Sequence, residues 1–119
     1  MRHALVLLLF VIPRLVAGQR TALDYGLASG SSVLIVTDWR QTLAFRGAGD
    51  REGNPLFGSF PSAGRVNTLI AAGLLANGLA LTLPKTPRRI WYITVIAVES
   101  YVVLHNATSH HSLWGISPP

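Results

Sequence analysis

The chain lacks cysteine and has little charge. With no cysteine among 119 residues, it can form no disulfide, no thiolate metal site and no cysteine nucleophile. Only 13% of the residues are charged, against about 25% in a typical soluble domain, whereas 50% are hydrophobic. This shortage of charge favours a membrane protein of one domain.

Acidic residues are scarcer than basic ones. Five Asp and Glu stand against ten Lys and Arg, which gives a formal net charge of +5. In a soluble protein this balance would suggest nucleic-acid binding. Here the cations mostly flank apolar runs, where they meet lipid headgroups, and no basic run is interleaved with aromatic residues. We therefore expect a lipid bilayer as partner and no nucleic acid.

Familiar catalytic and nucleotide-binding motifs are also missing. The glycines at 47, 49 and 53 do not have the G-x-G-x-x-G spacing, and no strand pattern precedes them. No H-E-x-x-H or H-x-x-x-H spacing occurs, and no serine lies in a nucleophile-elbow sequence. Motifs therefore assign no reaction.

Three apolar segments are long enough to cross a bilayer as helices, at 25–45, 64–83 and 90–111. Between them, 46–62 is a polar loop rich in Gly and Pro, and 84–89 (PKTPRR) is a tight basic turn. The sequence thus predicts an all-α integral membrane bundle with three transmembrane helices. Ser62 is the expected N-cap of the second.

The first residues allow two interpretations. Residues 1–18 have a basic start, an apolar core and small residues at the end, as a signal peptide does. Alternatively, 3–17 is a kinked anchor helix that is retained, because Pro13 interrupts it. In both cases 19–119 is a single transmembrane domain. Cleavage and the positive charge of PKTPRR favour opposite orientations, so the orientation stays open.

Small residues mark the faces expected to pack. The first half of 25–45 is rich in Gly, Ala and Ser, which let helices approach closely in lipid. In 64–83 the expected packing face consists of Ala72, Gly73, Ala76 and Asn77. Three short helices with such faces would expose much packing surface, so we expect self-association or contact with other membrane subunits.

Polar residues gather on one half of the predicted bundle. The antiparallel topology places on that half Asp38, Glu52, Asn54, Asn67, Glu99, His105 and Asn106. A charged residue inside a bilayer costs roughly 2.5–3.5 kcal/mol on insertion scales, so Asp38 and Glu99 should face protein rather than lipid. Asp38 and Thr42, four residues apart, share a helix face with Ser31.

Two hypotheses account for this gathering. In the first, each residue only bonds or caps a neighbouring helix. In the second, Asp38, Glu52, Glu99 and His105 form one cluster that binds a divalent metal such as zinc or manganese, or relays protons. The sequence alone leaves both open.

A wider pattern resembles a known family. Asp38-x-x-x-Thr42, Gly47, Glu52-x-Asn54-Pro55, and a last helix with Tyr101 and Asn106 resemble a group of small prokaryotic multi-helix membrane proteins of unknown function. The resemblance covers roughly residues 26–110. It implies a multi-pass protein of the prokaryotic inner membrane with Asp38, Thr42, Glu52, Asn54 and Pro55 as its motif. It implies no reaction.

The leading expectation is therefore a non-enzymatic function, as an accessory or assembly subunit of a larger membrane complex. The alternative is a small intramembrane enzyme or transporter that uses the Asp/Glu/His cluster. Whether the chain is an enzyme stays open at this point.

Overall fold

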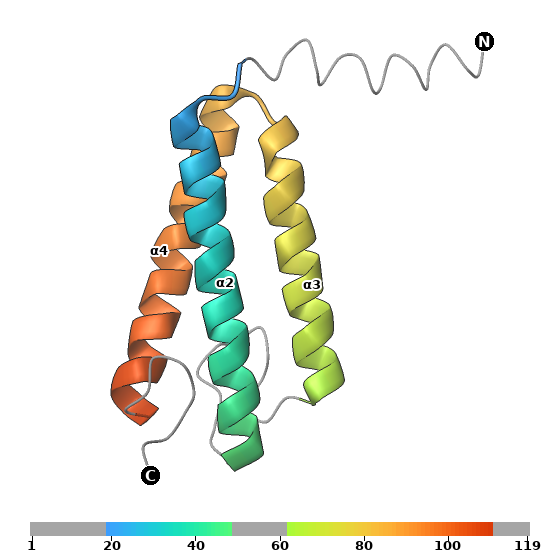
Figure 1. The fold of residues 1–119 in the computed structure, drawn as a ribbon, viewed down its shortest axis with the longest axis vertical. Helices are drawn as coiled ribbons and strands as arrows, with labels where there is room; N and C mark the ends of the chain where they lie inside the picture. Colours follow the sequence, from blue (N-terminus) through green and yellow to red (C-terminus); the bar gives the residue numbers. More distant parts are fainter. Residues whose placement is uncertain (1–18, 49–61, 111–119) are drawn as a thin grey trace, which may run out of the picture.

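The computed structural model describes residues 19–48 and 62–110, and within them the chain forms three α-helices and no strand. The helices are α2 (Ala22–Ala48), α3 (Ala63–Leu79) and α4 (Lys85–His110), and a 3-10 turn, η1 (Ala80–Thr82), follows α3. Consecutive helices run antiparallel, so α2 and α4 are parallel to each other, and α2 packs against both α3 and α4 (Figure 1). The all-α fold is confirmed for these residues.

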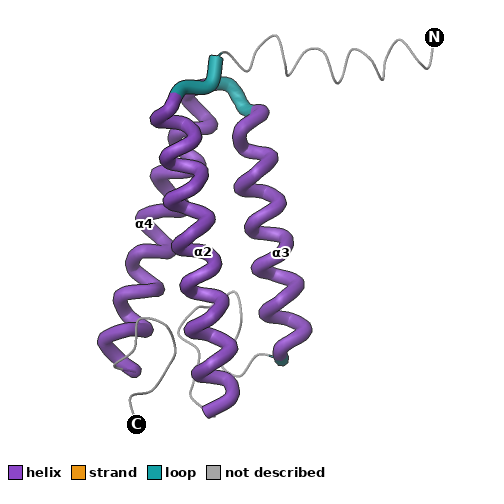
Figure 2. The backbone as a smooth tube through the Cα atoms, in the orientation of Figure 1, coloured by secondary structure: helices purple, strands orange, loops and turns teal. Residues whose placement is uncertain are grey.

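Each predicted helix is present with shifted ends. The segment 25–45 lies inside α2, 64–83 corresponds to α3 and η1, and 90–111 is preceded in α4 by five more helical residues. The tight turn predicted at 84–89 is wrong, because α4 begins at Lys85. Pro87 is tolerated in this first turn, where its missing N–H has no intrahelical partner to lose. The short connection from α3 to α4 is visible at one end of the bundle in Figure 2.

Side chains cap the starts of α2 and α3. The backbone N–H of Arg65 donates to Oγ of Ser62 at 3.1 Å, which confirms the predicted N-cap. At the start of α2, the backbone N–H of Thr21 donates to Oδ2 of Asp24 at 2.8 Å, and the N–H of Asp24 donates to Oγ1 of Thr21 at 3.4 Å. This reciprocal pair is a capping box.

Polar residues outnumber apolar ones in the buried interior. A small apolar core forms where Ile35 of α2 meets Val66 and Ile70 of α3. Among the described residues, nine buried side chains are polar or charged and seven are hydrophobic. The buried polar set is Asp24, Ser31, Thr37, Asp38, Gln41, Thr42, Asn77, Arg88 and Asn106. The interior therefore depends on hydrogen bonds as much as on apolar packing.

One described helix is long and apolar enough to cross a membrane, over Lys85–Ser109 of α4. In its most apolar 18-residue stretch only 22% is buried. The other two helices are not both long and apolar enough by the same measure. Helix α3 has only 17 residues, and the long α2 carries many of the buried polar side chains. The predicted first helix, 3–17, and the division at residue 18 lie outside the described residues.

Candidate functional site

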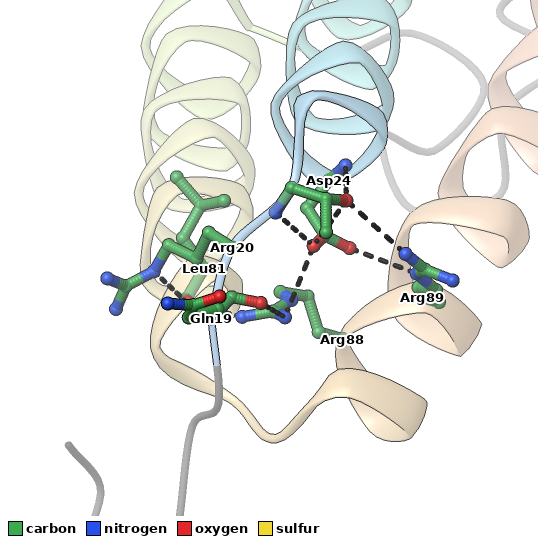
Figure 3. Close-up of polar contacts among 7 residues, drawn as sticks. Gln19, Arg20, Asp24, Leu81, Arg88 and Arg89 are labelled. Carbon is green, nitrogen blue, oxygen red and sulfur yellow. Dashed lines mark hydrogen bonds and ion pairs between the residues drawn. The ribbon is translucent and has the colours of Figure 1, made fainter. Parts of the chain in front are cut away.

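A buried ion pair holds one end of the bundle together. Nη2 of Arg88 lies 3.3 Å from Oδ2 of Asp24, and Nε of Arg89 lies 3.0 Å from Oδ1. Figure 3 shows both arginines reaching Asp24 from the start of α4. Arg88 also donates to the backbone carbonyls of Gln19 and Leu81, at 3.3 Å each. We call Thr21, Asp24, Arg88 and Arg89 the Asp24 cluster.

The surroundings of Asp24 keep it ionised. The hydrogen bond from the backbone N–H of Thr21 lowers the pKa of the Asp24 carboxyl most, and burial opposes it. The bonds from Arg89 and from the hydroxyl of Thr21, together with the charge of Arg88, lower the pKa further. The net direction is well below the ordinary value of an aspartate. At neutral pH this carboxylate therefore carries its charge and pairs with both arginines.

The second polar cluster surrounds Asn77 of α3 and links all three helices. Its Nδ2 lies 2.8 Å from both Oγ of Ser31 and Oγ of Ser32, and its Oδ1 accepts from Nε1 of Trp91 at 3.1 Å. An asparagine amide has two N–H donors and a carbonyl acceptor, so these three bonds form together. The hydroxyl of Tyr92 adds a 2.8 Å bond to the backbone carbonyl of Asn77. We call Ser31, Ser32, Asn77 and Trp91 the Asn77 cluster.

The third cluster joins α2 to α4 further along the bundle. Nδ2 of Asn106 lies 3.3 Å from both Oδ1 of Asp38 and Oε1 of Gln41. Thr42 donates to Oδ1 of Asp38 at 3.4 Å, and Gln41 donates to the backbone carbonyl of Val103 at 3.3 Å. These bonds are longer than those of the Asn77 cluster and are therefore weaker. We call Asp38, Gln41, Thr42 and Asn106 the Asp38 cluster.

A cavity of about 280 Å³ lies between the three helices beside Asp38. Most of its wall is apolar, and its polar lining comes from Asp38 of α2 and from Thr94 and Glu99 of α4. Oε2 of Glu99 is buried and has no hydrogen-bonding partner among the described residues. The cavity thus combines an apolar wall with a carboxyl oxygen that no described residue satisfies.

The structure separates His105 from the carboxylic residues of the cavity. His105 is exposed and does not line the cavity; its ring stacks on that of Tyr101, with centroids 6.0 Å apart. Glu52, Asn54 and Pro55 lie outside the described residues. In the parts of the chain that are described, no three His, Asp or Glu residues come together as a metal site. Asp38 and Thr42 of the predicted motif are both buried and bonded to each other.

The predicted packing face of α3 divides into different environments. Asn77 is buried at the helix contacts described above, whereas Ala72 is exposed and Ala76 is half-buried. Gly73 lines the cavity, and a Cβ atom there would meet nothing within 4 Å. Among the described residues, the helix contact at this face is therefore made by Asn77 and not by Gly73.

The sequence analysis did not identify the Asp24 cluster, and it did not identify Gln41 as a member of the Asp38 cluster. The T-x-x-D spacing of Thr21 and Asp24 is a capping signature that the sequence does display. Asp24, Ser31 and Asp38 are also spaced by seven residues, which puts them on one face of α2. The burial of Arg88 had no such signal, because it depends on where α4 begins.

Comparison of the chain with protein-family models, with curated proteins and with solved structures finds no match. The functional argument therefore starts from the geometry of the bundle.

Proposed function

We propose that the chain is a small integral membrane protein whose three helices all cross the bilayer, and that it serves as an accessory or assembly subunit of a larger membrane complex. The multi-pass location in a prokaryotic inner membrane, and the resemblance to the small prokaryotic family with the Asp38 and Glu52 motif, are parts of this proposal.

The observation that carries the proposal is the reversed distribution of polarity. Twelve large hydrophobic side chains of the described residues are exposed, while nine polar or charged ones are buried. The exposed set is Leu23, Tyr25, Val33, Leu75, Leu79, Leu83, Ile90, Trp91, Ile93, Val98, Tyr101 and Leu104. In water such a surface favours aggregation, whereas in hydrocarbon it matches the solvent. Polar interior contacts are what hold helices together in lipid.

The same distribution explains why the mean hydropathy of α2 understates how apolar its exposed surface is. Its polar residues Ser31, Asp38 and Gln41 are buried, so they do not meet lipid. Its exposed residues include Leu23, Tyr25 and Val33. A helix of 27 residues is about 40 Å long, which exceeds the roughly 30 Å of the hydrocarbon layer.

An unpartnered small-residue face supports a role in assembly. Gly26 and Gly30 have the G-x-x-x-G spacing and are exposed, and no described residue comes within 4 Å of where their Cβ atoms would lie. Gly26 is roughly 200° around the helix from Asp24, so this face points away from the buried stripe. In membranes such a face lets a second helix approach closely.

The test is a native-membrane assembly assay with the full chain. Gly26→Leu combined with Gly30→Leu should shift the protein from a larger complex to its own mass of 12.8 kDa in mild detergent. Gly78→Leu is the matched control, because Gly78 is also exposed and open but lies on α3. The proposal fails if the wild type is already a monomer or if the double variant stays in the complex. Extraction of the wild type by alkaline carbonate would refute the membrane location itself.

An intramembrane enzyme or transporter is the second candidate. The observation that favours it is that Asp38 and Glu99 line one cavity. Since an ionisable residue inside the membrane is costly, its retention there is typical of substrate and ion sites. A site of this kind needs no protein partner, so it can be tested separately from assembly.

A further inference from the structure

We propose that the cavity between α2, α3 and α4 is a binding site for a small organic cation with an apolar body, such as a quaternary ammonium compound. Glu99 supplies the counter-charge, and the aliphatic wall receives the apolar part. The inference rests on the proposed membrane location but not on the proposed role in assembly.

The position of Glu99 makes it an unusual acid. It is fourteen residues from the start of α4 and eleven from its end, so it lies roughly 21 Å along a helix of about 39 Å. In a helix that spans a bilayer this is close to the centre of the hydrocarbon layer. An acidic group there is expensive, and such groups usually serve a substrate, an ion or a proton.

The described neighbours of Glu99 leave one of its carboxyl oxygens unsatisfied. Its Oε2 is buried without a hydrogen-bonding partner in the described part of the chain, whereas Asp24 at the bundle end has two arginines. A buried polar atom without a partner costs about 1–3 kcal/mol, and more if it is charged. A cation in the cavity would remove that cost, so the site has a physical reason to prefer positive charge.

The wall of the cavity selects the kind of cation. A metal ion needs several oxygen or nitrogen ligands, and in the described part of the chain no set of three acidic or histidine residues is available. The wall instead offers Ile35, Leu69, Ile70, Val95 and Val98. These side chains attract hydrocarbon but cannot replace the water shell of a small inorganic ion. The match is a cation whose charge is spread over an apolar surface.

An aromatic residue adds to the preference for such a cation. Trp91 lies two helical turns before Glu99 on α4 and also lines the cavity. An indole face attracts quaternary ammonium groups through its electron-rich ring. The volume of about 280 Å³ is near the lower limit of ligand pockets, which points to a small ligand.

The site is open enough for the ligand to enter. Among the described helices, α2 makes extensive contacts with both α3 and α4, whereas α3 and α4 do not pack extensively on each other. A Cβ atom at Gly73 on the α3 wall would meet nothing within 4 Å, so a larger side chain has room to extend into the cavity. This provides a variant that blocks the site by volume alone and leaves both carboxyl groups intact.

Binding can be measured with benzyltrimethylammonium and the purified full chain in a non-ionic maltoside detergent, which carries no ammonium group, by calorimetry. Glu99→Gln keeps the shape of the side chain but removes its charge, and should weaken binding about tenfold, which corresponds to roughly 1.4 kcal/mol. Gly73→Leu should abolish binding, whereas Gly78→Leu, on the same helix but outside the cavity, should leave it unchanged. Benzenesulfonate, of similar size and opposite charge, should not bind. Circular dichroism confirms that each variant is folded.

Three results would overturn the proposal. They are no binding of the cation by the wild type, equal binding by Glu99→Gln, and equal binding by Gly73→Leu. The assembly role is tested by a separate variant, because Gly26→Leu with Gly30→Leu leaves the cavity wall intact and should bind the cation as the wild type does. Failure of one proposal therefore does not imply failure of the other.

Discussion

Replacing Asn77 by leucine should destabilise the bundle more than any other single polar-to-apolar change on α3. The side chain makes three hydrogen bonds that form together, two at 2.8 Å and one at 3.1 Å, and they reach both α2 and α4. Hydrogen bonds between membrane helices contribute about 0.6 kcal/mol on average and up to about 1.7 kcal/mol. Three of them therefore predict a loss of roughly 2 kcal/mol. Leucine has the same number of side-chain heavy atoms and is the larger residue, so no cavity adds to this value.

The assay is reversible unfolding in mixed micelles, followed by far-ultraviolet circular dichroism, with the free energy of unfolding as the readout. Asn67→Leu is the matched control. It makes the same chemical change on the same helix, but Asn67 is exposed and accepts one bond, from Nε1 of Trp39 at 2.9 Å. Its expected cost is about 0.6 kcal/mol.

A double-mutant cycle locates the loss. Ser31→Ala removes the hydroxyl that accepts from Asn77, so the costs of Ser31→Ala and Asn77→Leu should not add, and the coupling should be about 0.6 kcal/mol or more. The reasoning is refuted if Asn77→Leu costs no more than Asn67→Leu, or if the cycle shows no coupling. Either result would mean that Asn77 does not hold the three helices together.

The remaining predictions concern the other two clusters. Asn106→Leu should cost about 1 kcal/mol, less than Asn77→Leu, because its bonds to Asp38 and Gln41 are 3.3 Å long; the same unfolding assay measures this, and a larger cost would contradict the ranking. Asp24→Asn should destabilise the bundle at neutral pH, because it leaves the buried Arg88 without its counter-charge. The folded state lowers the pKa of Asp24, so its stabilisation is complete above about pH 4 and declines as the pH falls further. The wild type should therefore lose stability between pH 4 and pH 2 (roughly the range in which unfolded aspartates protonate), and Asp24→Asn should lose less; parallel curves would show that Asp24 is not the cause.

Helix positions were predictable because the chain alternates clearly between apolar runs and segments rich in Gly, Pro and charge. The ends of the helices were less predictable. Hydropathy cannot tell that KTPRR continues a helix, since Lys, Thr, Pro and Arg are all common in turns. The deciding interaction is distant, because Arg88 and Arg89 pair with Asp24, which is more than sixty residues away. A single-sequence argument has no access to that pairing.

Only part of the candidate site was predictable from the sequence. The cost of burying charge predicts that Asp38 turns towards protein, and it is buried beside Thr42 as expected. The same argument could not decide between Glu99 and His105. They lie six residues apart on α4, which puts them about 120° apart around the helix, so one lies on the cavity wall and the other is exposed. Topology gives the depth of a side chain, but helix rotation decides its partner.

The seven-residue spacing of Asp24, Ser31 and Asp38 connects these results. A repeat of seven keeps residues on one side of a helix, and such a stripe normally carries the apolar seam between packed helices. Here the stripe is polar, and each member anchors a different contact: Asp24 to the start of α4, Ser31 to Asn77 of α3, and Asp38 to Asn106 of α4. In water, a seam of this kind would exchange its bonds for bonds to solvent at little cost. Hydrocarbon offers no such exchange, so in the bilayer location that we propose the polar seam would favour one register of the three helices and leave the apolar residues free to face lipid.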